Sequence, residues 1–251
     1  TLPNLELNEL SRCLEFELER YIPGKKKESM MIDYKILYSL VNNQMVVFLI
    51  ALERQIIEER ISLVIDAGLL PNSINIDSLA LMNAYNAAQL YSKEVMAILD
   101  IGHAVTKLVV FQGDTLYFSR DINNGVYDLI RLVCERTNVD FNTLNELGTN
   151  LAEKSKDLYM EIKKNLNGLV DELRLSFEYC ARHLQKKIGQ LYLSGGGSKI
   201  KIIEEALATN LNLKTSGLNI TQGFKLAPSV KREDLKEYGL LLAVAVGLAT
   251  G

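Results

Sequence analysis

The chain has 251 residues, which is enough for one large domain or two modest ones. Hydrophobic residues make up 48% and charged residues 24%, as in ordinary globular proteins. The net charge of −3 argues against general nucleic-acid binding. The longest apolar runs, 45–52 and 240–249, fall short of the ~20 residues that span a bilayer, so direct membrane insertion is not expected.

Cysteine and histidine usage gives further bounds. Cys13, Cys134 and Cys180 lie far apart and form no C-x-x-C pair. This pattern favours a reducing compartment, so we expect a cytoplasmic protein without a cysteine-based metal site. Only His103 and His183 are present, which makes zinc chemistry unexpected. The first ten residues, TLPNLELNEL, lack the basic and apolar parts of a signal peptide.

Residues 1–76 are predicted to form a compact α+β unit. Leucines at helical spacing precede Pro23 and Gly24, which end a helix. Two apolar runs around Asn42-Asn43 have the pattern of a hairpin. The expected elements are a helix at 5–20, strands at 31–40 and 45–52, a helix at 53–67 and a strand at 71–76.

Residues 77–94 are predicted to be a connecting helix, with Asp77 as the N-cap of a helix over 78–91. Residues 95–251 are predicted to form a second, larger α/β lobe. Its first part is a meander of three strands, because short apolar runs alternate with turn residues such as Gly113-Asp114. The expected strands are 95–100, 104–111, 116–120, 191–194 and 213–218, and the expected helices are 126–136, 142–147, 151–184 with a break near 167–168, 199–210 and 235–248.

The turn after the first meander strand is one candidate site. Asp100 ends a buried strand, and Gly102 permits close approach to the backbone. Nucleotide phosphates need close N–H donors and, through a hydrated Mg²⁺, a carboxylate. Asp100 is therefore a candidate metal and phosphate ligand, and Thr106 either binds a phosphate or orders the turn. The alternative is an ordinary turn in which Asp100 only caps the backbone.

A second candidate is the run Gly195, Gly196, Gly197 and Ser198 between a strand and a helix. Three glycines are more than a tight loop needs, because each costs backbone entropy on folding. Such a loop lets a flat ring lie against the backbone and directs the helix dipole at an anion. Its spacing matches neither G-x-x-x-x-G-K-[ST] nor G-x-G-x-x-G, and a plain strand–helix loop is the alternative.

In this order, the two motifs resemble the actin, sugar-kinase and heat-shock-chaperone ATPase superfamily. The resemblance implies a ribonuclease-H-like α/β fold and ATP or ADP with Mg²⁺ as ligands. It makes the Asp100 turn the second phosphate-binding turn and the glycine loop the adenosine motif. It also implies that Glu172 faces the adenine and ribose, although a solvated surface glutamate is the alternative. His103 replaces an expected small or hydroxyl residue, and it either lies over the phosphates or is structural.

Several segments resemble the PilM family of type IV pilus assembly proteins, which are relatives of the division protein FtsA. The resemblance implies that 1–76 is the inserted subdomain of an actin-like cytoplasmic scaffold, peripheral to the inner membrane. The implied partners are the cytoplasmic N-terminal peptide of the inner-membrane protein PilN and the secretion ATPases; self-association is left open. Tyr21, Ile22 and Pro23 are candidate partner contacts. The segments are LPNLELNELSRCLEFELERYIP, GLLPNSINIDSLAL, DIG, SRDINNG, ELRLSFEY and YLSGGGSKIKIIEEAL.

One departure from the family pattern concerns the first phosphate-binding turn, of D-x-G-x-x-x-x-K type, which the family carries before the position of Thr1. We therefore expect weak nucleotide binding, or none, and an adaptor with at most weak ATPase activity. Two alternatives stay open. One is an ATPase or kinase that uses Asp100 with Mg-ATP. The other is an FtsA-like cell-division protein, which ranks lower because no amphipathic helix ends the sequence.

Overall fold

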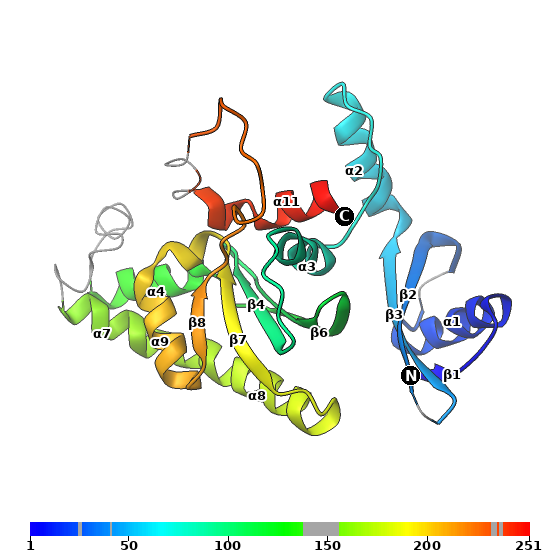
Figure 1. Ribbon diagram of the computed structural model, residues 1–251, viewed down its shortest axis with the longest axis horizontal. Coiled ribbons are helices and arrows are strands. Elements are labelled where there is room, and N and C mark those ends of the chain that lie inside the picture. The colour runs from blue at the N-terminus through cyan, green and yellow to red at the C-terminus, as the bar shows by residue number, and fades with distance from the viewer. Residues whose placement is uncertain (25–26, 41, 138–155, 232–234, 236–237) are drawn as a thin grey trace. The chain divides into compact units, whose positions relative to one another are not determined.

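The computed structural model describes residues 1–24, 27–40, 42–137, 156–231, 235 and 238–251. Contacts divide the chain into two compact units, Thr1–Ile74 and Asn75–Gly251 (Figure 1). Each unit is described by itself. The helix expected at 142–147 and the first residues of the one expected at 151–184 lie outside the described residues.

The first unit is a three-stranded antiparallel sheet with a helix packed on it. The sheet order is β1-β3-β2, and β2 pairs with β3 over almost their full lengths. The hairpin turn is where the sequence predicts it, with Asn43 at φ 56°. The two-residue strand β1 was not predicted. The elements are β1 (Leu2–Pro3), α1 (Leu7–Tyr21), the 3₁₀ helix η1 (Lys27–Ser29), β2 (Met30–Leu40), β3 (Gln44–Glu53) and α2 (Arg54–Asp66).

A small core joins α1 to this sheet. Leu10 and Leu14 of α1 are buried against Leu2 and Met45. Side chains on successive strand residues point to opposite faces, so Val47 and Leu49 of β3 join the same cluster as Met45. The helical spacing of the leucines places them on one face of α1, and the two-residue period of β3 places its apolar side chains on the face that meets them. The two patterns together explain why this sequence forms a helix on a sheet.

The strand predicted at 71–76 is wrong, and so is the N-cap assigned to Asp77. No strand forms here, Ile74 is exposed, and the Ile76 N–H donates to the Asn75 side chain at 2.8 Å. A short alternating run without a neighbouring strand has no partner for its backbone groups. The next helix has Ile76 as its N-cap, and Asp77 lies in the first turn, where its charge favours the helix dipole.

The second unit is built on a five-stranded sheet of order β6-β5-β4-β7-β8. Strands β4, β5 and β6 form the predicted antiparallel meander, and β7 runs parallel to β4. The elements are α3 (Asp77–Ala87), β4 (Val95–Ile101), β5 (Thr106–Gln112), β6 (Thr115–Ile122), α4 (Val126–Thr137), α7 (Lys156–Asn165), α8 (Asn167–His183), β7 (Ile188–Ser194), the 3₁₀ helix η3 (Gly196–Lys199), α9 (Lys201–Leu211), β8 (Lys214–Gly217), the 3₁₀ helix η4 (Gly239–Leu241) and α11 (Ala243–Thr250).

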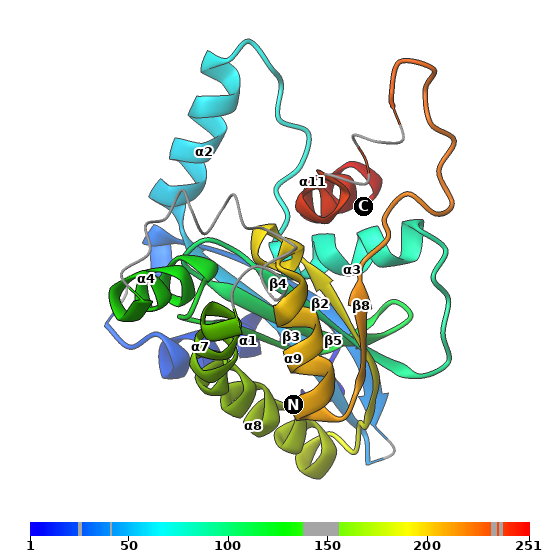
Figure 2. The same ribbon diagram turned by 90° about the vertical axis from the view of Figure 1, so that its left-hand side faces the viewer.

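Helices cover both faces of this sheet (Figures 1 and 2). Helices α4, α7, α8 and α9 pack on one face, in a core that includes Leu99, Leu108 and Leu191. Helix α3 lies on the other face, where the Tyr85 ring meets Phe111 and Tyr192 at 5.0 and 5.4 Å. Helix α11 packs on α3. Since side chains alternate along a strand, Asp100 of β4 points to the face that carries α3.

The helix predicted at 235–248 is interrupted. Residues 235 and 238 are helical and 236–237 lie outside the described residues; the 3₁₀ helix η4 follows, and α11 begins only at Ala243. Gly239 is poorly suited to a helix interior, and the Leu240 carbonyl group accepts a bond from Gly195 instead of continuing a helical ladder. In the part of the chain that the structure describes, no helix combines the length and the apolar character needed to span a membrane.

Candidate nucleotide site at the ends of β4 and β7

The two sequence motifs lie side by side. Asp100 near the end of β4 pairs in register with Ser194 at the end of β7, and both strands run in the same direction. Carboxyl ends of adjacent parallel strands form one edge of a sheet, the usual place for ligands in open α/β sheets. The fold therefore brings the Asp100 turn and the glycine loop to one location.

The Asp100 carboxyl group lies in a mixed electrostatic environment. Burial raises its pKa above the ordinary value, and this is the largest effect. The negative charge of Asp77 raises the pKa further, whereas a hydrogen bond from Ser194 and the charge of Lys107 lower it. Lys107 also forms an ion pair with Asp121 on β6. Asp77 is a second acid at the site, and no sequence motif indicates it, because it joins the site through the fold.

The three glycines of the loop have different reasons to be glycine. Gly195 has φ +82°, and a Cβ atom there would lie 2.6 Å from the Ile101 carbonyl oxygen and 2.9 Å from Asp100 Oδ1. A Cβ atom at Gly197 would lie 2.4 Å from the Ile101 side chain. Gly196 is exposed, and its Cβ would make only an ordinary contact, 3.6 Å from Leu241.

Packing within the chain therefore explains Gly195 and Gly197 but not Gly196. The missing side chain at Gly196 leaves exposed backbone where a bound group could lie flat. This open backbone beside a carboxylate fits a nucleotide, as the resemblance implies. The sequence alone does not distinguish the roles of the three glycines, whereas their surroundings in the structure do.

A distant segment holds the glycine loop in place. The Gly195 N–H donates to the Leu240 carbonyl oxygen at 2.8 Å, and Ser194 Oγ donates to the same oxygen at 3.1 Å. Ser198 Oγ donates to the Gly195 carbonyl oxygen at 2.6 Å and closes the loop on itself. Ser198 is buried, so its hydroxyl is a structural donor. Leu240 acts through its backbone, which no side-chain motif can indicate.

Bonds within the Asp100 turn account for Gly102 and Thr106. The Gly102 N–H donates to the Val105 carbonyl oxygen at 3.0 Å, and a Cβ atom at Gly102 would lie 2.7 Å from that oxygen. Thr106 is fully buried, and its hydroxyl donates to the Asn124 carbonyl oxygen at 2.6 Å. Of the two roles predicted for Thr106, the structure shows the ordering of the turn.

His103 lies on the surface of this turn, next to the start of α4. Its carbonyl oxygen accepts the Tyr127 N–H at 2.9 Å, and its ring lies 4.9 Å from the Tyr127 ring. The Val126 N–H likewise donates to the Gly102 carbonyl oxygen at 3.0 Å. The first donors of α4 are thus used by the turn itself. His103 has a structural neighbour and remains exposed beside the site.

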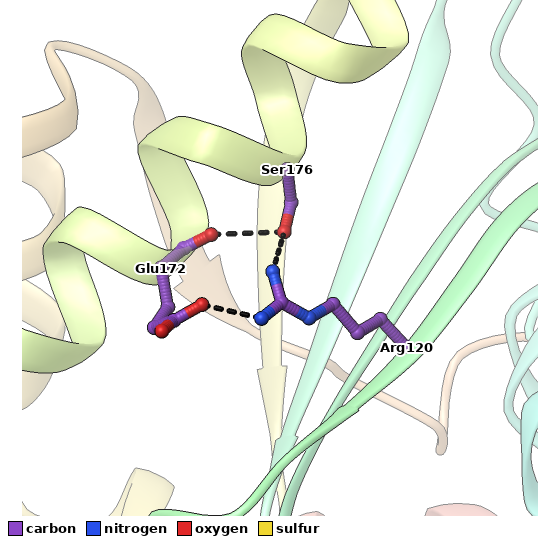
Figure 3. A network of polar contacts seen from close by, with 3 residues as sticks. All are labelled: Arg120, Glu172 and Ser176. Atoms are coloured by element: carbon purple, nitrogen blue, oxygen red, sulfur yellow. Dashed lines mark hydrogen bonds and ion pairs between the residues drawn. The ribbon is translucent and has the colours of Figure 1, made fainter.

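Glu172 is not brought to the other candidates and contacts Arg120 and Ser176 instead, as Figure 3 shows. It lies on α8, which packs on the sheet face opposite to the one that carries Asp100, and it forms an ion pair with Arg120 of β6. Ser176 accepts a hydrogen bond from Arg120 at 3.2 Å and donates to the Glu172 carbonyl oxygen at 2.8 Å. In the structure, Glu172 joins α8 to the edge strand of the sheet.

A pocket of about 950 Å³ opens next to the glycine loop. It follows the end of β8 and shares Leu240 with the loop contacts described above. Its volume is in the range of small-molecule sites. Most of its lining is apolar, including Phe224, and Asn219, Thr221 and Lys225 supply polar groups.

The candidate partner residues lie at the end of α1 in the first unit. Tyr21 is the last helical residue, and 70% of its surface is exposed. The Ile22 N–H caps the helix by donating to the Leu18 carbonyl oxygen at 2.8 Å, and Pro23 is exposed. These residues end the helix, and Tyr21 also presents a large ring to solvent.

The described residues contain no group of three or more His, Cys, Asp or Glu side chains that could hold a metal ion by themselves. Mg²⁺ is commonly bound by one or two carboxylates together with ligand phosphates and water. Asp100, with Asp77 acting on it from α3, meets this smaller requirement. The residues present therefore fit Mg²⁺ delivered with a nucleotide.

Solved structures place this geometry in a fold class. The PilM-PilN type IV pilus biogenesis complex matches at 26% identity over 99% of this chain and 73% of its own, with a TM-score of 0.81. The ethanolamine utilization protein EutJ from Carboxydothermus hydrogenoformans matches at 14% identity over 97% of this chain and 73% of its own, with a TM-score of 0.50. The fold is that of the actin-like ATPase proteins, as the resemblance implied.

The family follows from the sequence itself. The family model described as Type IV pilus assembly protein PilM matches residues 2–250. The chain therefore belongs to the PilM family, and its role lies in type IV pilus assembly. A search of curated proteins finds no match.

Proposed function

We propose that this chain is a nucleotide-responsive adaptor of type IV pilus assembly. It binds ATP or ADP with Mg²⁺ at the ends of β4 and β7, and it binds the cytoplasmic N-terminal peptide of a PilN-like inner-membrane protein. One observation carries the nucleotide part: Asp100 and the Gly195–Gly197 loop adjoin in a chain that matches the PilM family from residue 2 to 250.

The residues have separate tasks in this site. Asp100 would hold Mg²⁺ through its water shell, and Mg²⁺ would neutralise charge on the phosphates. Gly196 would leave backbone open to the ligand, because no side chain covers it. The pocket with Phe224 and Lys225 would take the part of the ligand that lies beyond the loop. None of these groups positions an attacking water, so we propose binding rather than rapid turnover.

The partner proposal rests on family membership and on the solved PilM-PilN complex, which is similar to this chain. The exposed ring of Tyr21 in the first unit is suited to anchoring a peptide, since aromatic residues are enriched in binding interfaces. We further propose a cytoplasmic location, peripheral to the inner membrane, with the secretion ATPases as additional partners.

Calorimetric titration with Mg-ADP and Mg-ATP tests the nucleotide site. We expect binding that Asp100→Ala weakens by at least about tenfold, the effect of one lost strong contact. Asp171→Ala, at an exposed carboxylate on α8, is the matched control and should leave binding unchanged. No heat with either nucleotide, or equal affinity in Asp100→Ala, contradicts the proposal.

A titration with the N-terminal peptide of the PilN-like protein tests the partner. We expect micromolar binding that Tyr21→Ala weakens, while Tyr91→Ala, at an exposed tyrosine of the second unit, leaves it unchanged. Absence of peptide binding counts against the adaptor. ATP turnover that Asp100→Ala and Asp77→Ala both abolish would favour the enzyme alternative instead.

A further inference from the structure

The Ser194 hydroxyl lies beside two oxygen groups that can accept its one hydrogen. It is fully buried at the end of β7. Its Oγ donates to the Leu240 carbonyl oxygen at 3.1 Å. Asp100 is its in-register neighbour on β4, so the two side chains point to the same face of the sheet, and the Ser194 hydroxyl lowers the pKa of the Asp100 carboxyl group. A serine hydroxyl carries a single hydrogen, so a stronger bond to one acceptor weakens the bond to the other.

The Leu240 oxygen is an anchor of the C-terminal segment. It accepts one further hydrogen bond, from the Gly195 N–H at 2.8 Å. Leu240 lies in η4, and α11 starts immediately afterwards, with the Val246 N–H bonded to the Leu242 carbonyl oxygen at 2.8 Å. A change in the hydrogen bonds to the Leu240 carbonyl oxygen therefore affects the first turn of α11 directly.

Helix α11 packs so closely on α3 that it has little room to shift when the hydrogen bonds at Leu240 change. A Cβ atom at Gly247 would lie 1.7 Å from the Ala80 carbonyl oxygen of α3, so these two helices touch through their backbones. Helix α3 begins with Asp77, whose charge acts on Asp100. The contacts thus form a ring, from Asp100 through Ser194 and Leu240 to α11, and back through α3.

We infer that Ser194 couples the Asp100 carboxylate to the start of the C-terminal helix by sharing its hydroxyl hydrogen between Asp100 and Leu240. The inference deepens the proposed nucleotide site, on which its ligand-dependent part rests. With the site empty, the carboxylate competes with Leu240 for the hydrogen. When Mg²⁺ and a phosphate are bound, the Asp100 carboxylate would be engaged in holding them. Ser194 would then donate its hydrogen to Leu240 alone, and η4 and α11 would be held more tightly.

Hydrogen–deuterium exchange of peptides covering 239–250 tests this in the nucleotide-free protein. Asp100→Asn removes the charged acceptor and should slow exchange. Ser194→Ala removes the donor and should speed it about three- to tenfold, as for the loss of one hydrogen bond. In the double variant, Asp100→Asn should have no further effect, because the shared hydroxyl is absent.

Ser198→Ala is the matched control. Ser198 is a buried serine of the same loop, but its hydroxyl donates to Gly195 and, among the described residues, does not bond to Leu240 or Asp100. In this background Asp100→Asn should still slow exchange. Ser194→Thr keeps a hydroxyl and should restore the response. If Ser194→Ala does not fold, Ser194→Cys replaces it, since it keeps the volume and weakens the donor.

The outcomes separate the inference from the proposed function. Equal effects of Asp100→Asn in the presence and absence of Ser194 overturn the coupling, as does unchanged exchange in Ser194→Ala. Saturating Mg-ADP should slow exchange at 239–250 in the wild type and not in Ser194→Ala. If no nucleotide binds at all, the proposed function fails, while a non-additive pair of variants still supports the coupling.

Discussion

The Asp100 turn and the glycine loop end neighbouring strands, yet the chain holds them in different ways. The turn closes on itself through Gly102 and Val105 and is tied to the next helix in sequence. The loop is tied to Leu240, which is far along the chain. The turn is therefore a local structure, whereas the loop depends on the C-terminal segment and can respond to it. Substitutions that separate local from distant support test this difference.

The largest effect is expected for Gly195→Ala. The substitution places a Cβ atom at φ +82° and 2.6 Å from the Ile101 backbone oxygen, which cannot move freely within the sheet. We expect a loss of about 3 kcal/mol in the free energy of unfolding, measured by urea denaturation. Gly113→Ala is the control: its φ is +55° with nothing within 4 Å, so about 1 kcal/mol is expected. Equal losses would show that the contact with Ile101 is unimportant.

Thr106→Val tests the local support of the turn. Valine keeps the shape but removes the donor, leaving the Asn124 carbonyl oxygen without its 2.6 Å hydrogen bond. The expected destabilisation is about 2 kcal/mol in the same urea measurement, because Thr106 is fully buried. Thr209→Val, on an exposed helix surface, should change stability by less than about 0.5 kcal/mol. A similar loss at both positions would contradict a special role for Thr106.

Asp100→Asn should stabilise the protein at neutral pH. Because burial raises the pKa of Asp100 in the folded state, its ionised form destabilises the fold above that raised pKa. The penalty disappears as pH falls through the raised pKa towards the ordinary value of 3.8. The variant should therefore melt at a higher temperature than the wild type at pH 7, and the difference should shrink towards pH 4. A difference that stays constant with pH would argue against this origin.

Gly196→Ala should have the smallest effect on stability. Its Cβ atom would meet only Leu241, at an ordinary 3.6 Å, so a change below about 0.5 kcal/mol is expected. If the exposed backbone serves a nucleotide, affinity for Mg-ADP should nevertheless fall by about tenfold in calorimetric titration. Unchanged affinity together with unchanged stability would remove the ligand argument from this loop.

Much of the fold follows from periodicity. The leucines of α1, the meander over 95–120 and the strand before the glycine loop all have strong patterns, and the structure confirms these elements. The strand predicted at 71–76 does not form. Alternating apolar residues alone do not make a strand, because its backbone groups need a partner strand. The two residues of β1 are too few to carry a pattern.

The site was predictable only where its residues carry motifs. Asp100 and the glycine loop can be recognised as motifs in the sequence, and the parallel pairing of β4 with β7 makes them neighbours. Asp77, Ser194 and Leu240 contribute through packing, electrostatics and backbone contacts between segments distant in sequence. Glu172 illustrates the converse, because the resemblance placed it near the ligand and the fold places it on the opposite face with Arg120.

The strand order of the second unit also has a kinetic consequence. The meander of β4, β5 and β6 is built from contacts between neighbouring segments, whereas β7 joins β4 from a distant part of the chain. Local contacts generally form faster than distant ones. We therefore expect the amides of β5 to gain protection before those of β7 in pulsed hydrogen exchange during refolding. The Asp100 carboxylate would then meet Ser194 only in a late step, so a newly made chain would pass through a folded meander that has no ligand site.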